Sequence, residues 1–582
     1  MSKLALIKSA NSLRDLAILL GYQPSALSFI VHKIPDAEKY AESSVPKKTG
    51  GVRTIRSPCP KLKEVQKRLS EFLYGCIDEL NMERMTLNPK FKDTLVHGFY
   101  KGRSIMTNAT PHRNKKVVLN LDLEDFFGSI NFGRVRGYFI GSKDFTLSEA
   151  VATVIAKICC FDNSLPQGAP TSPVVSNLIG RIFDLRVVQL ASKYGVHYTR
   201  YADDLTFSTN EVEFPKELVR LSKGKDHWLV GRELKALIER SGFKVNAKKT
   251  RVQFRISRQD VTGLVVNSRV NTPSEYRRLA RAMAHRLFMT GKFERVVKEI
   301  DVNGKVVERA KPGTLDQLTG VFSYIVGVDE YERQRQRDGG SDKEAKLPML
   351  KVFGELLFYR HFYANEKPVI ICEGKTDITY LRCAIRGLAS EFPVLAQLGE
   401  EGNISLNVSF FNCSAKNANY LELNGGADQL RSFLSSYMNR FNSFKAQASL
   451  QPLIILIDND SGARKIYSLI KQLTASKAEI KGDEPVYNVY QKVYVVPTPK
   501  INGKDSKIED FFPAEILAEK LEGKSFNSEN VELSSSEYGK HYFAEYIIKP
   551  KRKNIDYSLF RPMLKTISDI IAVREEVMSG AR

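Results

Sequence analysis

Two adjacent carboxylates, those of Asp203 and Asp204, are the side chains of this sequence best placed to do chemistry. They end a Tyr-Ala-Asp-Asp segment that lies between two strand-like runs, at 196–200 and 205–207. This pattern predicts a β-hairpin with both acids at its turn. Neighbouring acids at a turn oppose folding, because like charges repel and burial disfavours the ionised form. A divalent cation bound between them would remove that penalty.

A third acid with suitable surroundings, Asp122, lies in the apolar run at 117–123, which predicts another strand. Three carboxylates on two strands can hold two Mg²⁺ ions. Two such ions support in-line phosphoryl transfer, because one activates the attacking hydroxyl and the other stabilises the triphosphate and the leaving group. The sequence therefore predicts Mg²⁺ as the cofactor, in a site of the kind found in the palm of nucleic-acid polymerases.

The elements expected to position these acids are helices and short strands. Short helices are predicted over 1–45, followed by a basic hairpin at 46–57. Further helices are expected at 60–80, 146–160, 173–194, 231–241 and 273–290, and further strands at 253–256 and 261–266. A second pattern starts at Pro368, with strand 369–372, helix 376–386, strand 453–457 and helix 464–473, and it predicts a parallel sheet. The polar segment 332–340 is expected to be a mobile linker.

The net charge of +22 is concentrated in the first part of the chain. Residues 1–300 hold 50 Lys and Arg against 29 Asp and Glu, an excess of 21, whereas residues 301–582 hold 38 against 37. An excess of that size favours binding to a polyanion through counterion release. The first part of the chain is therefore expected to bind nucleic acid.

The seven cysteines form no CxxC pair and have no histidine cluster beside them, so no zinc site is expected. Reduced thiols fit a cytosolic protein. The N-terminus has no secretory signal, and no apolar run approaches the ~20 residues that span a membrane. These features predict a soluble cytoplasmic protein with no membrane partner.

Four segments, in this order, resemble the motifs of reverse transcriptases, a branch of the right-hand polymerases. They are Leu-Asp-Leu-Glu-Asp-Phe-Phe at 121–127, Leu-Pro-Gln-Gly-Ala-Pro-Thr-Ser-Pro at 165–173, the hairpin acids at 201–204, and Gly-Phe-Lys-Val-Asn-Ala-Lys-Lys-Thr at 242–250. Two shorter segments, Asn-Ala-Thr-Pro-His at 108–112 and Val-Thr-Gly at 261–263, resemble elements of bacterial retron reverse transcriptases. The resemblance covers roughly residues 30–290 and implies a fold of fingers, palm and thumb.

The resemblance implies a role for each matching residue. Asp122, Asp203 and Asp204 would bind the metal ions and catalyse the transfer. The residues that would meet the incoming nucleotide are Phe127, Gln167, Gly168, Lys47, Arg53, Arg56, Lys248 and Lys249. Phe127 would exclude a 2′-hydroxyl, or it is a core residue only. Lys47, Arg53 and Arg56 would bind the triphosphate or the RNA backbone, and the sequence does not separate Lys248 from Lys249 as proton donor to pyrophosphate.

The RNA-binding residues implied by the retron elements and by the basic helix are Asn108, His112, Val261, Thr262, Gly263, Arg277, Arg278 and Arg281. His112 would contact RNA or support the fold locally, and the arginines would hold the template–primer duplex or form a solvated face. Retron reverse transcriptases copy part of a structured noncoding RNA from an RNA 2′-hydroxyl, which gives a branched RNA-linked DNA called msDNA. The implied partners are therefore the cognate RNA, its msDNA and dNTPs, in a bacterial cytoplasm and in defence against phage.

Acids also follow two strands of the second pattern. Glu373 follows strand 369–372, and Asp458 and Asp460 follow strand 453–457. Acids at the carboxyl ends of neighbouring parallel strands converge where such sheets bind ligands, so these three are expected to bind Mg²⁺. The arrangement resembles the TOPRIM fold of topoisomerases, primases and overcoming-lysogenization-defect nucleases.

A nuclease is the favoured reading of this second site. A topoisomerase needs a tyrosine in a further DNA-gripping domain, and a primase would be redundant. Lys375 would steady the scissile phosphate, and Asp377 lies in the same segment. Glu509 or Asp510 would complete a second metal site or cap a helix.

The expected fold class is α/β and α+β multidomain, a right-hand polymerase followed by a TOPRIM-like parallel α/β domain. The expected domains are an N-terminal helical segment at 1–45, the reverse transcriptase at 46–300, a connecting segment at 301–366, the nuclease at 367–520 and an unassigned segment at 521–582. The expected function is retron RNA-directed DNA synthesis with a fused Mg²⁺-dependent nuclease. A group II intron maturase and a non-catalytic nucleic-acid scaffold remain alternatives. The nuclease target and self-association of the chain stay open.

Overall fold

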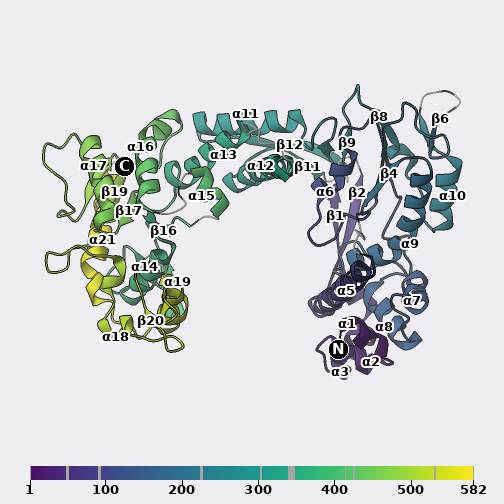
Figure 1. The fold of residues 1–582 in the computed structure, drawn as a ribbon, viewed down its shortest axis with the longest axis horizontal. Coiled ribbons are helices and arrows are strands. Elements are labelled where there is room, and N and C mark those ends of the chain that lie inside the picture. The colour runs from purple at the N-terminus through teal and green to yellow at the C-terminus, as the bar shows by residue number, and fades with distance from the viewer. Residues whose placement is uncertain are drawn as a thin grey trace. The chain divides into compact units, whose positions relative to one another are not determined.

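The computed structural model describes residues 2–46, 51–88, 94–222, 224, 227–301, 305–338, 348–412, 415–421, 423, 426–529 and 533–580. The chain forms two compact units. The first consists of Met1–Arg277, Val296–Lys311 and Gly327–Glu344, and the second of Arg278–Arg295, Pro312–Val326 and Ala345–Arg582. Figure 1 labels the helices and strands of both units.

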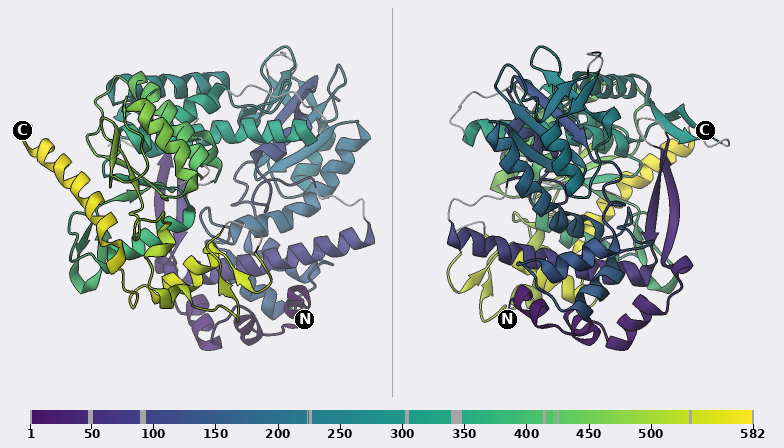
Figure 2. Two further views of the ribbon diagram at one scale, coloured as in Figure 1. Left: turned by 60° about the vertical axis from the view of Figure 1, so that its left-hand side comes forward. Right: turned by 90° about the vertical axis from the view of Figure 1, so that its right-hand side faces the viewer.

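The first unit begins with helices and a hairpin. The helices are α1 (Lys3–Ser9), α2 (Leu13–Leu19), α3 (Pro24–His32), α4 (Asp36–Lys39) and α5 (Pro60–Leu87). Strands β1 (Tyr40–Pro46) and β2 (Val52–Pro58) pair antiparallel, and Figure 2 shows them as a long two-stranded ribbon. The expected helical segment at 1–45 therefore ends at Lys39, because Tyr40 already pairs with Pro58.

A four-stranded antiparallel sheet in the order β4-β5-β3-β8 forms the centre of the first unit. Its strands are β3 (Val117–Asp122), β4 (His197–Tyr201), β5 (Asp204–Thr209) and β8 (Arg251–Phe254). The helices of this region are α6 (Ile105–Ala109), α7 (Phe132–Gly141), α8 (Glu149–Cys159), α9 (Ser172–Lys193) and α10 (Arg232–Arg240). Strands β3 and β5 share one apolar core with helices α1–α3, α5 and α7–α10. Burying this core fixes the edge of the sheet at which β3 ends and β5 begins.

A fully buried ion pair lies beside this edge. The Arg200 guanidinium in β4 donates two hydrogen bonds of 2.8 Å to the carboxylate of Asp184 in α9, and both side chains are at most 1% exposed. The same guanidinium donates to the backbone oxygen of Ala202 at 3.1 Å, and Tyr198 donates to Asp184 at 2.8 Å. The pair therefore holds the turn after β4 in place.

We expect Asp184→Asn to lower the free energy of unfolding of the first unit by about 3–5 kcal/mol, because Arg200 would stay buried without its counter-charge. Trp228 is the single tryptophan of the chain and lies in the first unit, so its fluorescence during urea unfolding reports on this unit. The control is Glu233→Gln, which removes an exposed pair with Lys193 and should cost less than about 1 kcal/mol. Equal losses in both variants would contradict the assignment.

The second unit contains a five-stranded sheet in the order β16-β13-β17-β19-β18. Strands β16 (Ser409–Phe410), β13 (Val369–Cys372), β17 (Leu453–Ile457) and β19 (Val493–Pro497) are parallel, and β18 (Tyr487–Tyr490) is antiparallel. Its main helices are α13 (Pro348–Phe358), α14 (Lys375–Gly387), α15 (Ala415–Leu421), α16 (Ala427–Ser443), α17 (Arg464–Leu473) and α21 (Arg561–Gly580). Strands β13 and β17 read as continuous apolar runs, as expected for strands covered on both faces.

The segment after residue 520, unassigned from the sequence, belongs to the core of this sheet. Phe543, Phe560 and Leu564 are fully buried in one apolar cluster with Ile370 and Ile454 of the central strands. It contains β20 (Ser525–Phe526), β21 (Glu537–Tyr538), α19 (Lys540–Tyr542) and helix α21, drawn in yellow in Figure 2. The C-terminal segment is therefore part of the second unit.

The expectation of a mobile linker at 332–340 is wrong for 332–338. These residues continue helix α12 (Leu315–Asp338). Glu332 is 3% exposed and pairs with Arg335. This polar segment is therefore part of a helix that is packed at Glu332. Across the described residues, none of the helices combines the length and apolarity needed to cross a bilayer.

Candidate functional site

The three aspartates of the first unit lie together where β3 meets the β4–β5 turn. Asp122, the last residue of β3, is directly opposite Asp204, the first residue of β5. The backbone N–H of Leu123 donates to the backbone oxygen of Asp203 at 2.9 Å. Ala202 has φ +56°, the left-handed conformation that lets the turn close in two residues. The structure thus brings Asp122, Asp203 and Asp204 to one end of the sheet.

The electrostatics of this cluster favour a bound cation. Burial, followed by the charge of Asp122, raises the pKa of Asp203. Burial, followed by the charges of Asp203 and Asp122, raises the pKa of Asp204 to about 6. Lys249 Nζ lies 2.6 Å from Asp122 Oδ2, and its charge lowers the pKa of the other two acids. A lysine ammonium here supplies part of the positive charge that these carboxylates attract.

The donor set fits Mg²⁺, since three carboxylates at one strand edge supply the hard oxygens that this ion prefers. In the described part of the chain, however, no three acid, histidine or cysteine side chains form a ready-made metal cluster. The ion pair with Lys249 engages Asp122 instead. Metal binding would therefore require this ammonium to release Asp122.

The residues expected to contact the nucleotide differ in their burial and in their contacts with the three aspartates. The half-buried Phe127 ring lies 6.1 Å from that of Phe99 and 5.5 Å from that of Phe126. Arg53 is exposed, and its charge lowers the pKa of Asp203. Lys249 contacts Asp122, whereas exposed Lys248 has no such contact, which favours Lys249 of the two. Lys47 lies outside the described residues.

The loop of Gln167 and Gly168 is joined to the hairpin at Arg56. The backbone N–H of Arg56 donates to the backbone oxygen of Gln167 at 2.7 Å. Gly168 has φ +120°, and a Cβ there would lie 2.7 Å from the backbone oxygen of Arg56. Only glycine allows this approach, so the loop and the basic hairpin are positioned together.

Asn108 and His112 are fully buried, which favours support of the fold, the alternative expected for His112, over contact with RNA. His112 hydrogen-bonds Ser208 at 2.7 Å and Thr199 at 2.8 Å, and Thr199 donates to Asn108 at 2.8 Å. This network ties the 105–112 segment to β4 and β5. The Asn-Ala-Thr-Pro-His element therefore supports the strands that carry Asp203 and Asp204.

Val261 of the second retron element is also fully buried, so it does not meet RNA directly. It lies in β9 (Asp260–Val261), which pairs with β10 (Leu264–Val265). Thr262 and Gly263 form the turn, with φ values of +47° and +81°. Gly263 is exposed and Thr262 is half-buried, so RNA contact at this element stays a prediction for the turn alone.

Burial lowers the pKa of His112 to about 3, with smaller effects from His197, His97 and Lys115. Because the unfolded chain then binds this proton more tightly than the folded chain, stability falls as pH decreases from about 6.5 towards 3. We expect a slope of about 1.4 kcal/mol per pH unit from this residue. Comparing wild-type and His112→Asn unfolding from pH 7 to pH 5, again through Trp228, measures it. The same slope in both proteins would contradict this origin.

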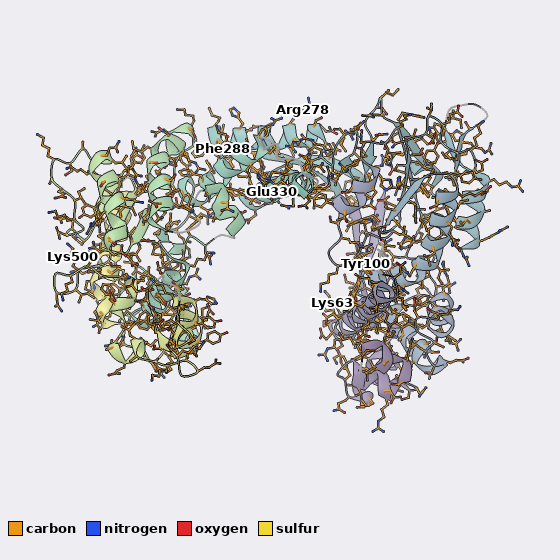
Figure 3. All side chains as sticks on the ribbon, in the orientation of Figure 1. Lys63, Tyr100, Arg278, Phe288, Glu330 and Lys500 are labelled. Carbon is orange, nitrogen blue, oxygen red and sulfur yellow. The ribbon has the colours of Figure 1, made fainter. Side chains whose placement is uncertain are left out.

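The basic helix α11 (Ser274–Thr290) divides into two parts. Arg277 is not free to hold a duplex, because it donates to both carboxylate oxygens of Asp329 at 2.7 and 2.8 Å. Arg278 and Arg281 are exposed and three residues apart, so they lie on one side of the helix (Figure 3 labels Arg278). Backbone binding therefore remains a prediction for these two arginines.

The acids of the second unit also lie at one edge of a sheet. Strands β13 and β17 are parallel, with Cys372 opposite Leu456. Glu373 and Asp458 therefore follow neighbouring strands at the same end of the sheet. Asp458 Oδ1 accepts a hydrogen bond from the Ile508 N–H at 2.9 Å. The pKa of Asp458 is raised to about 8, mainly by burial and then by the charges of Asp377, Glu509 and Glu373. Burial and then Asp460 raise the pKa of Glu373. Five acids thus share one electrostatic environment.

Lys540 is the residue of this site that sequence reasoning missed. Its Nζ lies 3.0 Å from Glu509 Oε1, and Glu509 is 1% exposed. It comes from the C-terminal segment, 31 residues beyond Glu509. No local motif marks it, so only the folded chain places it here.

The other candidate residues of the second site differ from one another in the contacts that they make. Asp510 is exposed and accepts a hydrogen bond from the Lys507 N–H at 2.7 Å, so it caps a helical turn. Asp377 accepts from the Gly374 N–H at 2.6 Å as the cap of α14, yet it also affects Asp458. Exposed Lys375 lines a recess of about 50 Å³ beside Glu373.

The sheet edge with its three aspartates has the architecture of a polymerase palm, and comparison with known proteins defines the family. Residues 45–277 match the family model described as reverse transcriptase (RNA-dependent DNA polymerase). The chain is 35% identical over 291 residues to the retron Mx65 reverse transcriptase of Myxococcus xanthus, covering 47% of this chain and 62% of that protein. It is 32% identical over 285 residues to the retron Ec86 reverse transcriptase of Escherichia coli, covering 49% and 74%.

This chain belongs to the retron reverse transcriptase family. It spans about three fifths of the length of the Mx65 relative. Among solved structures, telomerase from Candida albicans with a telomeric RNA fragment matches at a TM-score of 0.30 and 11% identity, covering 55% of this chain and 63% of the other, and that score adds nothing to the assignment. The family model ends at residue 277, so it does not extend to the five-stranded sheet.

Proposed function

We propose that the first unit is an RNA-directed DNA polymerase that copies a cognate structured noncoding RNA into msDNA. The observation that carries the proposal is the convergence of Asp122, Asp203 and Asp204 beside Lys249 and Arg53, in a chain of the retron family. Mg²⁺ bound by these aspartates would activate the attacking hydroxyl and stabilise the triphosphate.

The chain's own residues would position the substrates. Arg53 would contact the triphosphate, and Phe127 would stand below the sugar of a dNTP, where a 2′-hydroxyl does not fit. Lys249, once it leaves Asp122, is placed to donate a proton to pyrophosphate. Arg278 and Arg281 belong to the second unit and would contact a nucleic-acid backbone there.

We further propose that the second unit is a TOPRIM-like, Mg²⁺-dependent nuclease. Its support is the group formed by Glu373, Asp377, Asp458, Asp460 and Glu509 at the carboxyl edge of a parallel sheet, where burial and neighbouring acids raise the pKa values of Glu373, Asp458 and Glu509. Glu373, Asp458 and Asp460 would bind the ion. Lys540 neutralises Glu509 and is placed to contact a scissile phosphate.

The two activities would act together as a bacterial antiphage device, with msDNA restraining the nuclease. The proposed domains are the polymerase, at 46–300 except for 278–295, which belong to the second unit, and the nuclease at 367–520 extended by the packed segment after 520. The segment at 1–45 precedes the polymerase, and 301–366 contributes to both units. The buried Phe543, Phe560 and Leu564 support that extension.

Sequencing the nucleic acid that co-purifies with the full chain tests the proposal. We expect a single structured RNA covalently joined to DNA complementary to part of it. Intron RNA would favour a maturase instead. Nucleic acid of mixed sequence that persists unchanged without Mg²⁺ would favour a non-catalytic scaffold.

A further inference from the structure

A recess of about 650 Å³ opens in the N-terminal part of the first unit, and none of the three aspartates lines it. Its walls come from the end of α3, from α4, from the start of α7, from α8 and from the 160–163 loop. This volume lies in the range of sites that hold small organic ligands, about 300–1,000 Å³.

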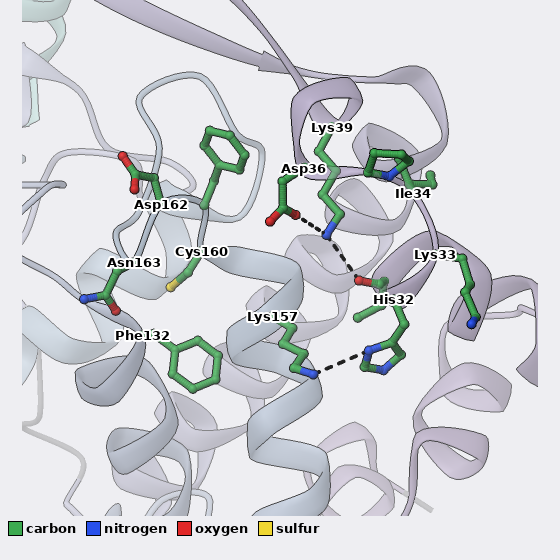
Figure 4. A pocket seen from close by; sticks show the side chains of 13 residues that line it. His32, Lys33, Ile34, Asp36, Lys39, Phe132, Lys157, Cys160, Asp162 and Asn163 are labelled. Atoms are coloured by element: carbon green, nitrogen blue, oxygen red, sulfur yellow. Dashed lines mark hydrogen bonds and ion pairs between the residues drawn. The ribbon is translucent and has the colours of Figure 1, made fainter.

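The recess carries lysines without acidic partners. Lys157 Nζ lies 3.4 Å from His32 Nδ1, and in Figure 4 the two side chains point toward each other. Burial, followed by the charges of Lys157, Lys39 and Lys33, lowers the pKa of His32. Among the described residues, neither Lys157 nor Lys33 forms an ion pair.

The two acids of the recess are already engaged. Asp36 pairs with Lys39 at 2.8 Å. Asp162 is exposed and faces Arg56 at 3.8 Å, although Arg56 pairs more closely with Glu42, at 2.8 Å. Neither acid pairs with Lys157 or Lys33, so the side of the recess formed by these two lysines is positive. An anion placed there would meet an ammonium and an imidazole at hydrogen-bonding distance from each other.

The recess also offers an aromatic surface. Phe161 is occupied, because its ring lies 4.5 Å from that of Tyr40 and the Arg56 guanidinium lies 5.3 Å from its centre. Phe132, half-buried at the start of α7, has no ring or cation partner among the described residues. Phe132 packs in part against the core and in part lines the recess. A positive group in the same recess as an aromatic ring is the combination that binds a phosphate and a base of the same nucleotide.

We propose that this recess binds one nucleotide, with its phosphate at Lys157 and His32 and its base against Phe132. The nucleotide is either free or an unpaired residue of a bound RNA. The site is independent of the proposed catalysis, since its residues lie outside the carboxylate cluster.

Binding of adenosine 5′-monophosphate to the full chain in EDTA tests the site, because chelation suppresses metal-dependent binding at the aspartates. We expect measurable affinity that exceeds that of inorganic phosphate, and a loss of about tenfold or more in Lys157→Gln. Phe132→Leu, which keeps the bulk of the side chain, should reduce affinity for the nucleotide but not for phosphate. Lys8→Gln removes an exposed lysine of α1 outside the recess and should change neither.

A single-stranded RNA oligomer separates the two sources. If RNA affinity falls in Lys157→Gln and the mononucleotide competes with RNA, the occupant is a residue of bound RNA. If only mononucleotide affinity falls, the occupant is a free nucleotide. Unchanged affinity for both ligands in Lys157→Gln and Phe132→Leu, or phosphate binding as tightly as the nucleotide, would overturn the proposal.

Discussion

Asp203→Asn is expected to reduce DNA synthesis on the cognate RNA by about a thousandfold or more. The substitution keeps the size of the side chain but removes one of the three charges that would hold the metal ions, and these ions supply several kcal/mol of transition-state stabilisation. Because it also relieves repulsion from Asp122 and Asp204, the fold should not weaken. Primer extension by single-turnover kinetics, with Trp228 fluorescence as the measure of folding, gives both quantities.

The matched control is Glu124→Gln, which removes an exposed acid two residues after Asp122. Its backbone N–H bonds the Lys244 backbone oxygen at 2.8 Å, and that contact survives the substitution. Near-normal synthesis is expected. If Asp203→Asn retains as much synthesis as Glu124→Gln, the polymerase assignment fails.

Asp458→Asn is expected to abolish Mg²⁺-dependent cleavage of nucleic acid and, in EDTA, to stabilise the second unit. The folded-state pKa of about 8 lies above the unfolded value of 3.8, so ionising Asp458 costs the folded state increasing stability from about pH 4 to pH 8. Asparagine carries no charge, and its oxygen still accepts from Ile508. At pH 7.5 the gain should be on the order of 5 kcal/mol. Calorimetry of the full chain and cleavage of a panel of DNA and RNA substrates test the two effects.

Asp483→Asn serves as the control, because Asp483 is exposed and pairs only with Lys500 at 2.6 Å. It should leave cleavage and thermal stability nearly unchanged. DNA synthesis should be normal in both variants, since neither residue lies in the first unit. A stabilised Asp458→Asn protein that still cleaves would separate the acidic cluster from catalysis.

Local sequence patterns predicted the parts of both sites that local structure determines. The hairpin at Asp203 and Asp204 and the helix at 464–473 follow from strand and helix periodicity, and the structure has both. The parallel order of β13 and β17 follows from their alternation with helices. Acids placed directly after such strands must come close together, which is why they were predictable.

Contacts between distant residues were not predictable in this way. Arg200 lies in a strand between Thr199 and Tyr201, and its burial is compensated by the charge of Asp184 in α9 together with hydrogen bonds to Asn177 and Ala202. Asn108 and His112 belong to a segment that resembles an RNA-binding element. Their side chains nevertheless both hydrogen-bond Thr199 inside the protein. Glu332 is buried inside helix α12, and the polar residues that follow it continue the same helix, which composition does not reveal.

The arrival of Lys540 from near the end of the chain has a consequence for biosynthesis. While the ribosome is still making the second unit, Glu509 has no ammonium beside it, and Phe543, Phe560 and Leu564 are not yet there to cover the central strands. The first unit, by contrast, is wholly translated before β13 begins. A nascent chain would therefore have time to capture its RNA before the acidic centre of the second unit can be completed.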